Sequence, residues 1–353
     1  MADGMQAERV SADIPTQLRL QPFSEGRGTW QELLKSCPGV TLYHRESWIE
    51  LLSRAYGFSL WLATLEQSRR TIAGCVFVRR PLSRCLIALP FSDTGLPLAR
   101  DYEAAQRLLD ALIAQAAPGR AYEVRGIAGA VPWETVECFV DWKLRLDRPP
   151  ASIERALALN FRRSLRRASQ QAIRIERGSA MGDLHRFYAM QLESRRRLGL
   201  PPQPLRFFKL ARETFAADGN FEVWTARENG EDVASAIFIR DGDVVYFKWG
   251  ARRLNYRSNA NHLLLWNAIE EFASRVRTLD LGRADVRNEG LMRFKAELGA
   301  TASPLPSSFY PRAPSQVSAE VLTGTRALMA RIWSRLPIFA TRVAGRAVYR
   351  YLA

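Results

Sequence analysis

The chain has 353 residues, 47% of them hydrophobic and 10% aromatic, which suffices for two ordinary domains and excludes a largely disordered protein. Its 51 Lys and Arg exceed its 36 Asp and Glu, and the charge of +15 favours polyanionic partners such as RNA, anionic lipid or phosphorylated molecules, unless it serves only solubility. The N-terminus lacks the apolar segment of a signal peptide and no long apolar run follows, so we expect a cytoplasmic protein without a membrane-spanning segment.

The first half of the chain is predicted to form helices and strands after a loose leader over residues 1–20. Trp48 and Leu52 have helical spacing, and Asp101 is placed to cap a later helix. The predicted elements are helices over 30–36, 45–55 and 101–116, strands over 59–65, 71–79, 84–89, 121–127 and 142–146, and a turn-rich loop over 90–95.

The second half repeats this order of elements, and the pair Pro149-Pro150 marks the boundary between the halves. The predicted elements are helices over 160–171, 183–198, 206–217 and 260–276, and strands over 173–177, 221–228, 232–240, 243–249 and 278–281. Antiparallel strands with flanking helices predict an α+β fold. We therefore predict an N-terminal domain over 21–150, a C-terminal domain over 151–312 and a tail over 313–353.

The tail differs in composition from the rest, since it holds six Arg, no Lys and one acidic residue, Glu320. Arg342, Arg346 and Arg350 recur every four residues and therefore share one helix face. With its apolar remainder, the segment 326–352 is typical of a pair of basic amphipathic helices. Such a tail attaches to an anionic membrane surface, docks on the body with solvated arginines, or contacts nucleic acid.

A second basic feature is the predicted helix over 160–171. Arg162, Arg163, Arg166 and Arg167 form one cationic stripe along it. The stripe is either a solvated helix face or a polyanion-binding surface for tRNA or anionic headgroups, with an affinity that falls steeply with salt. Aromatic side chains do not interleave with it, so base stacking is not indicated.

The most informative motif begins where a short apolar strand ends in Asp280, Gly282 and Arg283. A helical turn follows over 290–300 and carries Phe294 and Lys295. Further motifs precede it in the order Pro90-Phe91-Ser92-Asp93-Thr94-Gly95, the basic helix over 160–168, the Arg-rich segment 194–201, the strand 246–250 and the helix segment 263–266. Together they resemble the FemAB-like (BioF2-like) acyltransferases over roughly 42–304.

The resemblance implies two tandem GNAT-like domains with mostly antiparallel sheets and a groove between them. Members transfer an acyl group to an amine; FemAB proteins proper take amino acids from aminoacyl-tRNA and extend the peptide of a cell-wall precursor, and others belong to polysaccharide, capsule or exosortase loci. The basic tail is similar to that of the exosortase-associated subgroup. We expect no permanently bound cofactor, a lipid- or nucleotide-linked amine as acceptor, and a peripheral position on the inner face of the cytoplasmic membrane.

This chemistry requires a deprotonated amine, two reactants held together and a stabilised oxyanion. Because an ester or thioester donor is already activated, the reaction needs neither a nucleophile nor a metal, and the sequence holds no spacing typical of either. Asp280, at a strand end, is predicted to accept the amine proton or to orient Arg283, unless it only caps a turn. Lys295 is predicted to steady the oxyanion or a phosphate, unless it is a surface lysine. Asp93 is predicted to bind the amine, with an ordinary turn residue as the alternative.

Arg195 and Arg196 lie near the end of the predicted helix over 183–198. They form either a phosphate clamp for the acceptor or a pair of cations that complement the helix dipole. The motif matches complete the predicted substrate-binding set with Arg283, Phe294, Tyr246 and Trp249.

Two other functions are also compatible with the sequence. An acyl-CoA-dependent GNAT N-acetyltransferase would need a glycine-rich pyrophosphate loop before the helix over 260–276, yet no glycine occurs between Arg252 and Glu270. This departure weakens the CoA alternative. From another class, a non-catalytic basic binding protein would have the same fold.

Overall fold

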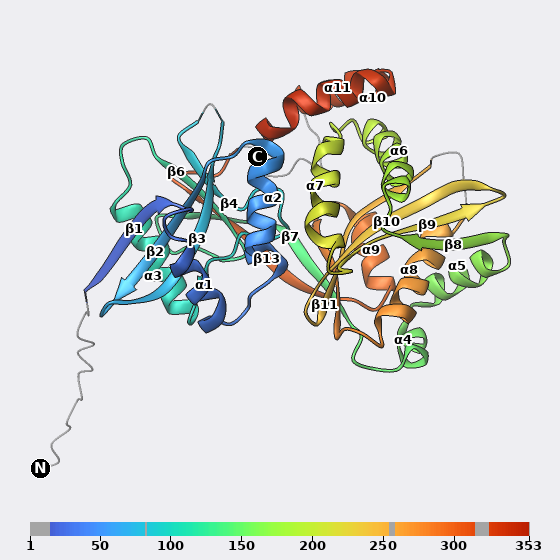
Figure 1. Ribbon diagram of the computed structural model, residues 1–353, viewed down its shortest axis with the longest axis horizontal. Coiled ribbons are helices and arrows are strands. Elements are labelled where there is room, and N and C mark those ends of the chain that lie inside the picture. Colours follow the sequence, from blue (N-terminus) through green and yellow to red (C-terminus); the bar gives the residue numbers. More distant parts are fainter. Residues whose placement is uncertain (1–14, 82, 254–257, 315–324, 353) are drawn as a thin grey trace, which may run out of the picture.

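The computed structural model describes residues 15–81, 83–253, 258–314 and 325–352. Its main strands form one mixed sheet in the order β1-β2-β3-β4-β6-β13-β7-β12-β11-β10-β9-β8, and helices cover both faces (Figure 1). The α+β class with two halves, mostly antiparallel strands and a helical C-terminal tail is confirmed.

The first half follows the predicted order closely. Asp101 caps α3 as expected, since its Oδ1 accepts from the backbone N–H of Ala104 at 2.7 Å. The elements are β1 (Thr16–Pro22), α1 (Arg27–Ser36), the 3-10 helix η1 (Leu42–His44), α2 (Glu46–Tyr56), β2 (Leu60–Gln67), β3 (Arg70–Arg79), β4 (Cys85–Ala88), β5 (Leu98–Ala99), α3 (Tyr102–Ala114), β6 (Ala121–Arg125) and β7 (Glu134–Arg145).

The second half repeats this order of α-helices and strands from its first strand onward, except that its described residues hold no counterpart of β5 and form an additional helix, α9, before its last strand. The elements are α4 (Pro150–Ala156), α5 (Leu159–Ser169), β8 (Ile173–Gly178), α6 (Met181–Arg197), α7 (Leu205–Ala216), β9 (Phe221–Glu228), β10 (Glu231–Asp241), β11 (Val244–Arg252), α8 (Ala260–Phe272), β12 (Thr278–Asp285), α9 (Glu289–Glu297) and β13 (Thr301–Tyr310). The tail forms α10 (Thr325–Arg335), α11 (Ile338–Val348) and the 3-10 helix η2 (Tyr349–Leu352).

Several elements depart from the sequence-based expectation: β5 and α4 were not predicted, β7 begins at Glu134 rather than near residue 142, and β1 and β13 differ most. Residues 16–20, predicted to belong to a loose leader, instead lie in β1, which pairs antiparallel with β2. Leu18 and Leu20 are half-buried, and the residues between and before them are exposed. This alternation is too short to predict a strand from the sequence. Strand β13 was not predicted, because it contains Pro304 and Pro306. Proline has no backbone N–H to donate to a neighbouring strand, so its presence argues against a strand.

The two halves exchange their last strands. β13 pairs with β6 through Ser307 and Arg125 and also lies along β7, whereas β7 pairs on its other side with β12. The last strand of each half is thus inserted beside the sheet of the other half. The boundary predicted near residue 150 stays a prediction, since the sheet continues across it.

One hydrophobic core is shared by both halves. The indole rings of Trp48 on α2 and Trp249 on β11 are stacked with centroids 6.3 Å apart. Phe207 of α7 meets the Trp249 ring edge-on at 5.4 Å. Separate cores lie where α3 covers the first half and where α5 and α8 cover the second. The shared aromatic core thus packs the two halves against each other.

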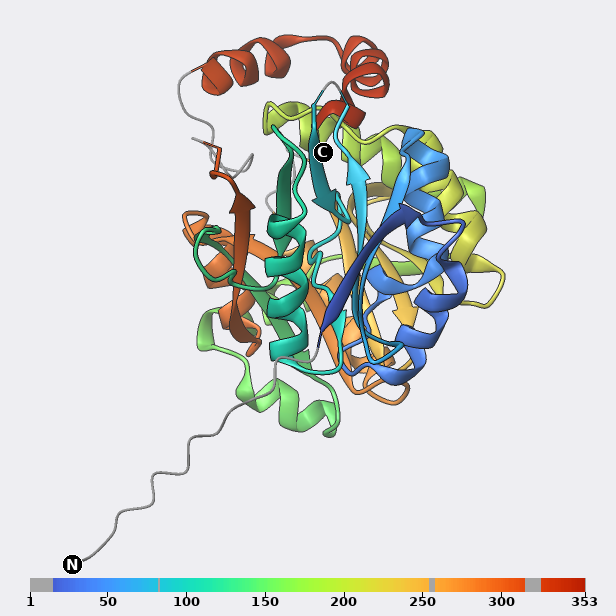
Figure 2. The same cartoon turned by 90° about the vertical axis from the view of Figure 1, so that its left-hand side faces the viewer.

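The tail helices lie along the top of the molecule in both views (Figures 1 and 2). The inner face of the tail docks on the body through buried Thr341, Gly345 and Tyr349. A Cβ at Gly345 would lie 2.7 Å from the carbonyl oxygen of Pro202, so this close approach requires glycine. None of the described helices combines the length and apolar character needed to cross a bilayer.

We expect the isolated fragment 15–150 not to fold. It would lose the partners of β6 and β7, and Trp48 would lose the aromatic side chains of the second half, leaving exposed strand edges that aggregate. Thermal melting followed by circular dichroism, with the full chain as control, measures this. A cooperative transition in the soluble fragment would show that the halves are independent.

Candidate functional site

The candidate site lies where two parallel strands diverge. β11 pairs with β12 only from Val244 to Tyr246, and Asp280 is the last residue of β12 in this pairing. The register of β12 with β7 then shifts between Asp280 and Arg283, which marks a β-bulge. Bulges redirect side chains and recur beside active sites. The motif identified in the sequence is therefore a bulge at the point of divergence.

The bulge is held from several sides. Gly282 has φ 68°, and its N–H donates to Asp280 Oδ1 at 2.7 Å. A Cβ at this position would lie 3.1 Å from Asp93 Oδ2, so glycine permits the close approach of the two halves. Lys295 is buried and donates from Nζ to the carbonyl oxygens of Gly282 at 2.8 Å and Arg283 at 3.0 Å. Lys295 thus positions the bulge, and its predicted direct contact with the reacting groups stays a prediction.

Asp93 sits on a tightly constrained loop between β4 and β5. Leu89 and Phe91 have φ values of 41° and 62°, which are costly for side chains other than glycine and persist only when the surroundings enforce them. Ser92 supplies that constraint: its Oγ accepts from Trp48 Nε1 at 2.8 Å and its carbonyl from Arg125 Nη1 at 3.0 Å. The loop therefore presents Asp93 rigidly.

Asp93 forms an ion pair with Lys248 of β11, in which the Lys248 side chain is buried and the Asp93 side chain is 23% exposed. Lys248 Nζ lies 2.8 Å from Asp93 Oδ2, and the Tyr43 hydroxyl donates to the same oxygen. Lys248 also lies near three aromatic rings, those of Tyr43, Trp48 and Trp249, at 4.7 to 5.7 Å. Burial alone would raise the pKa of Asp93, but Lys248 and Arg283 hold it well below its usual range. Asp93 therefore stays ionised at neutral pH and is unsuited to accept a proton.

Asp280 has the opposite electrostatic environment. Its side chain is buried, and burial together with the charges of Asp141 and Asp93 raises its pKa to about 7, against the opposing effect of Lys143. Asp141 and Lys143 come from β7, where they form an ion pair at 3.0 Å. Asp280 is therefore able to gain and lose a proton near neutral pH.

Two arginines share one aromatic ring beside the bulge. The guanidinium of Arg283 lies 4.5 Å from the Phe139 ring centroid and that of Arg125 lies 5.9 Å from it. Burial and the nearby Arg283 lower the pKa of Arg125 to about 10. Among the described residues, buried Arg283 Nη1 has no hydrogen-bond partner. The site therefore contains a spare cationic donor, suited to an oxyanion or another anionic group.

Three more of the predicted residues border this cluster. The Tyr246 hydroxyl accepts from the backbone N–H of Leu42 at 3.2 Å, and Trp249 belongs to the shared core below Lys248. Arg195 lies near Tyr349 of the tail. Burial raises the pKa of the Tyr349 hydroxyl, and the positive charge of Arg195 opposes part of this effect. These contacts connect the cluster to η1, α6 and the tail.

Other predicted residues lie elsewhere. Phe294 packs in the second core, with its ring centroid 5.8 Å from Phe161, and Arg196 is half-buried on α6 without a described contact to the cluster. The stripe on α5 is solvent-facing, with Arg162 half-buried and Arg163, Arg166 and Arg167 exposed. Its polyanion binding stays a prediction. Nowhere in the described residues do His, Cys, Asp and Glu gather as a metal site would require.

Sequence reasoning missed Lys248, Tyr43, Arg125 and Asp141. Lys248 had a usable signal, since it lies two residues from Tyr246 in a strand, on the same face, and interrupts an otherwise aromatic run. The others had none, because their roles depend on contacts between distant parts of the chain.

Comparisons with known proteins agree with this geometry. Residues 155–296 match the family model described as an acetyltransferase (GNAT) domain. Among solved structures, FemX matches with TM-score 0.59 and 13% identity, over 80% of this chain and 95% of that one. A tandem GNAT protein from the clavulanic acid biosynthesis pathway matches with TM-score 0.53 and 12% identity, over 85% and 100%. A structure described as the C-terminal domain of a lysylphosphatidylglycerol synthetase from Agrobacterium fabrum matches with TM-score 0.52 and 14% identity, over 88% and 95%.

The resemblance to FemAB-like GNAT proteins is thereby confirmed at the level of the fold, and the GNAT domain supports an acyltransferase. None of the curated protein sequences compared with the chain is significantly similar to it.

We expect Lys248→Met to destabilise the protein by at most about 3–5 kcal/mol, the cost of breaking a buried ion pair, because it leaves the largely buried Asp93 carboxylate without its cation. Lys143→Met is the matched control, since its ion pair is half-exposed and contributes about 1 kcal/mol or less. Urea denaturation at pH 7 measures both.

The Lys248→Met effect is expected to shrink as the pH falls below about 4. In the native protein the pKa of Asp93 is lower than in the unfolded chain, so the ion pair contributes stability above the unfolded pKa, and this stability is lost as the pH falls. In the variant, acidification protonates the unpaired Asp93 carboxylate and thereby removes the cost of its charge. Equal destabilisation by the two variants would show that the Lys248 pair is not a special constraint.

Proposed function

We propose that the chain is an N-acyltransferase that moves an activated acyl group onto an amine at the β12 bulge. One observation carries the proposal: Asp280, a buried carboxyl group with a pKa near neutrality, and Arg283 flank the β12 bulge at the point where β11 and β12 diverge. Asp280 acts as the general base and Arg283 as the donor to the oxyanion. Asp93 and Lys248 hold the two halves around them.

The reaction needs no enzyme nucleophile. The amine nitrogen attacks the donor carbonyl carbon, and its proton passes to Asp280. Negative charge develops on the carbonyl oxygen and is stabilised by Arg283 Nη1, which has no partner among the described residues. Collapse of this intermediate breaks the bond to the leaving oxygen or sulfur. The proton on Asp280 then returns to the leaving group.

For the donor we propose aminoacyl-tRNA. The FemAB-like resemblance, the exposed arginine stripe on α5 and the missing glycine loop before α8 support it over acyl-CoA. The tandem GNAT protein, whose description mentions acetyl-CoA, keeps acyl-CoA as the second candidate. For the acceptor we propose an amine of a cell-envelope or polysaccharide-related molecule, linked to a lipid or a nucleotide.

We expect purified protein to accelerate deacylation of aminoacyl-tRNA at low salt, with a rate that rises between pH 6 and pH 8 as Asp280 loses its proton. Asp280→Asn should lower this rate about 10²–10⁴-fold and abolish the rise. Radiolabelled aminoacyl-tRNA and release of free CoA from acetyl-CoA are assayed in parallel. Release of CoA alone would establish the CoA-dependent function, and no turnover of either donor would favour a binding protein.

The stability of Asp280→Asn distinguishes lost chemistry from misfolding. Because the folded pKa of Asp280 is raised, the native protein binds this proton more tightly than the unfolded chain and loses stability as pH rises from about 4 to about 7. The variant avoids the buried charge and should be at least as stable as the native protein at pH 8. A variant that unfolds at this pH would contradict the assigned environment.

We also propose that the tail holds the enzyme on an anionic membrane surface while it docks on the body. Among the described residues, most large apolar side chains left exposed outside loops belong to the tail, and Phe339 and Val343 of α11 are 69% and 53% exposed. Arg342 and Arg346 lie beside them and are also exposed. Apolar insertion flanked by arginines is the pattern of an interfacial helix, with each arginine contributing about 1 kcal/mol near anionic lipid.

The double variant Phe339→Ser/Val343→Ser should lose co-sedimentation with vesicles at low salt. The vesicles contain about 30% phosphatidylglycerol, which gives them a negative surface. Leu159→Ser, on the exposed side of α5 beside the arginine stripe, is the control and should bind like the native protein. If the double variant binds the vesicles like the native protein, or if only the control loses binding, the tail does not form the membrane contact.

A further inference from the structure

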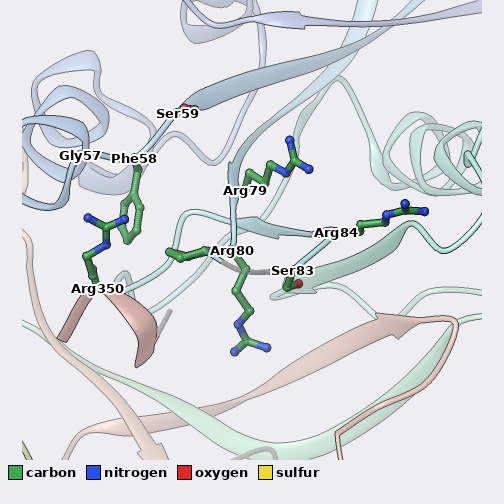
Figure 3. A pocket seen from close by; sticks show the side chains of 9 residues that line it. Gly57, Phe58, Ser59, Arg79, Arg80, Ser83, Arg84 and Arg350 are labelled. Atoms are coloured by element: carbon green, nitrogen blue, oxygen red, sulfur yellow. The ribbon is translucent and has the colours of Figure 1, made fainter. Parts of the chain in front are cut away.

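A separate cavity of about 510 Å³ lies in the first half, beside the end of the tail. Figure 3 shows Phe58 and Arg350 on one side of it and Arg79, Arg80 and Arg84 on the other. Gly57, Ser59, Pro81 and Ser83 complete its wall. Arg350 belongs to η2, so the cavity is made jointly by the β3–β4 connection and the tail.

The charge of this cavity is unusual. Four arginines line it and no Asp or Glu does. Within the described residues, Arg79, Arg84 and Arg350 form no ion pair; Arg84 donates only to the carbonyl oxygen of Pro118, at 3.1 Å. Arginines around one cavity offer several guanidinium donors to a ligand inside it, and bidentate binding of a phosphate is the interaction for which this group is best suited. The chemistry therefore points to a phosphate-bearing ligand.

The surroundings of the cavity indicate what kind of phosphate-bearing molecule it binds. Phe58 in its wall stacks on Phe91 at 6.1 Å, and Phe91 contacts the ring of Tyr349 at 4.9 Å, so the cavity adjoins the residue that docks the tail. Tyr351 and Leu352, next to Arg350, are exposed apolar side chains. A phosphate in the cavity would thus have exposed apolar surface of the tail beside it, which suits a molecule with a charged head and acyl chains.

We infer that the cavity of Arg79, Arg80, Arg84 and Arg350 binds the headgroup phosphate of an anionic membrane lipid. This inference deepens the proposed membrane attachment and rests on it for the choice of a lipid over a soluble phosphate. The bound headgroup does not react; it anchors the end of the tail and thereby fixes the orientation of the enzyme on the membrane. The amphipathic face of α11 supplies unspecific adsorption, whereas the cavity supplies selectivity for the headgroup.

Short-chain lipids test the cavity without a bilayer. Isothermal titration uses dihexanoyl phosphatidylglycerol below its micelle concentration, dihexanoyl phosphatidylcholine and inorganic pyrophosphate as probes. The full chain should bind the phosphatidylglycerol at least tenfold more tightly than either other probe. Arg79→Gln/Arg84→Gln and, separately, Arg350→Gln should each weaken this binding tenfold or more, while Arg163→Gln/Arg167→Gln, which removes the same charge from α5, should leave it unchanged.

Each alternative outcome overturns the inference in a recognisable way. Tighter binding of pyrophosphate than of the lipid would assign the cavity to a soluble phosphate ligand. Equal binding of the two lipids would show that the cavity does not select an anionic headgroup, and equal loss in the α5 control would reduce the binding to unspecific charge. Loss of tRNA binding rather than lipid binding in Arg79→Gln/Arg84→Gln would assign it to nucleic acid. Because the titration needs no turnover, it stands even where the donor assays fail, and Phe339→Ser/Val343→Ser, which lies outside the cavity, should retain full lipid binding.

Discussion

The exchange of last strands between the two halves is the constraint on which the rest of the molecule depends. Because β7 of the first half pairs with β12 of the second, Lys143 lies opposite Asp280 and Asp141 lies opposite Arg283. The acidic and basic neighbours that set the properties of the β12 bulge thus come from the other half. Asp93 and Lys248 repeat the arrangement across the shared core. The candidate site exists only in the joined molecule.

Two carboxyl groups close to one bulge have pKa values that differ because their surroundings differ. Asp93 has a direct cationic partner and a tyrosine donor, so its charged form is favoured despite burial. Asp280 is buried near two other carboxylates, so its neutral form is favoured. Environments that separate the pKa values of neighbouring acids are the usual means by which a protein assigns a structural role to one and a proton-transfer role to the other.

The sequence predicted most helices and strands, because each carries its own period of apolar residues and its own caps, as Asp101 does for α3. It also located Asp280, Arg283 and Asp93 through motifs. It missed β13, whose prolines hide its strand character, and it missed Tyr43 and Arg125, whose roles arise from contacts over long distances in the chain. Lys295 shows the limit of a motif: the position was informative, but only the fold shows that its charge holds two backbone carbonyls.

The strand exchange also has a consequence during synthesis. β6 and β7 leave the ribosome well before β12 and β13, and at about 5–20 residues per second the delay before β13 emerges is on the order of 10–30 s. Throughout that interval the nascent first half carries strand edges with unpaired backbone groups, which are prone to intermolecular pairing. A pause of translation between residues 145 and 301 would prolong this exposure of unpaired edges, so the strand exchange makes the order and pace of synthesis relevant to correct folding.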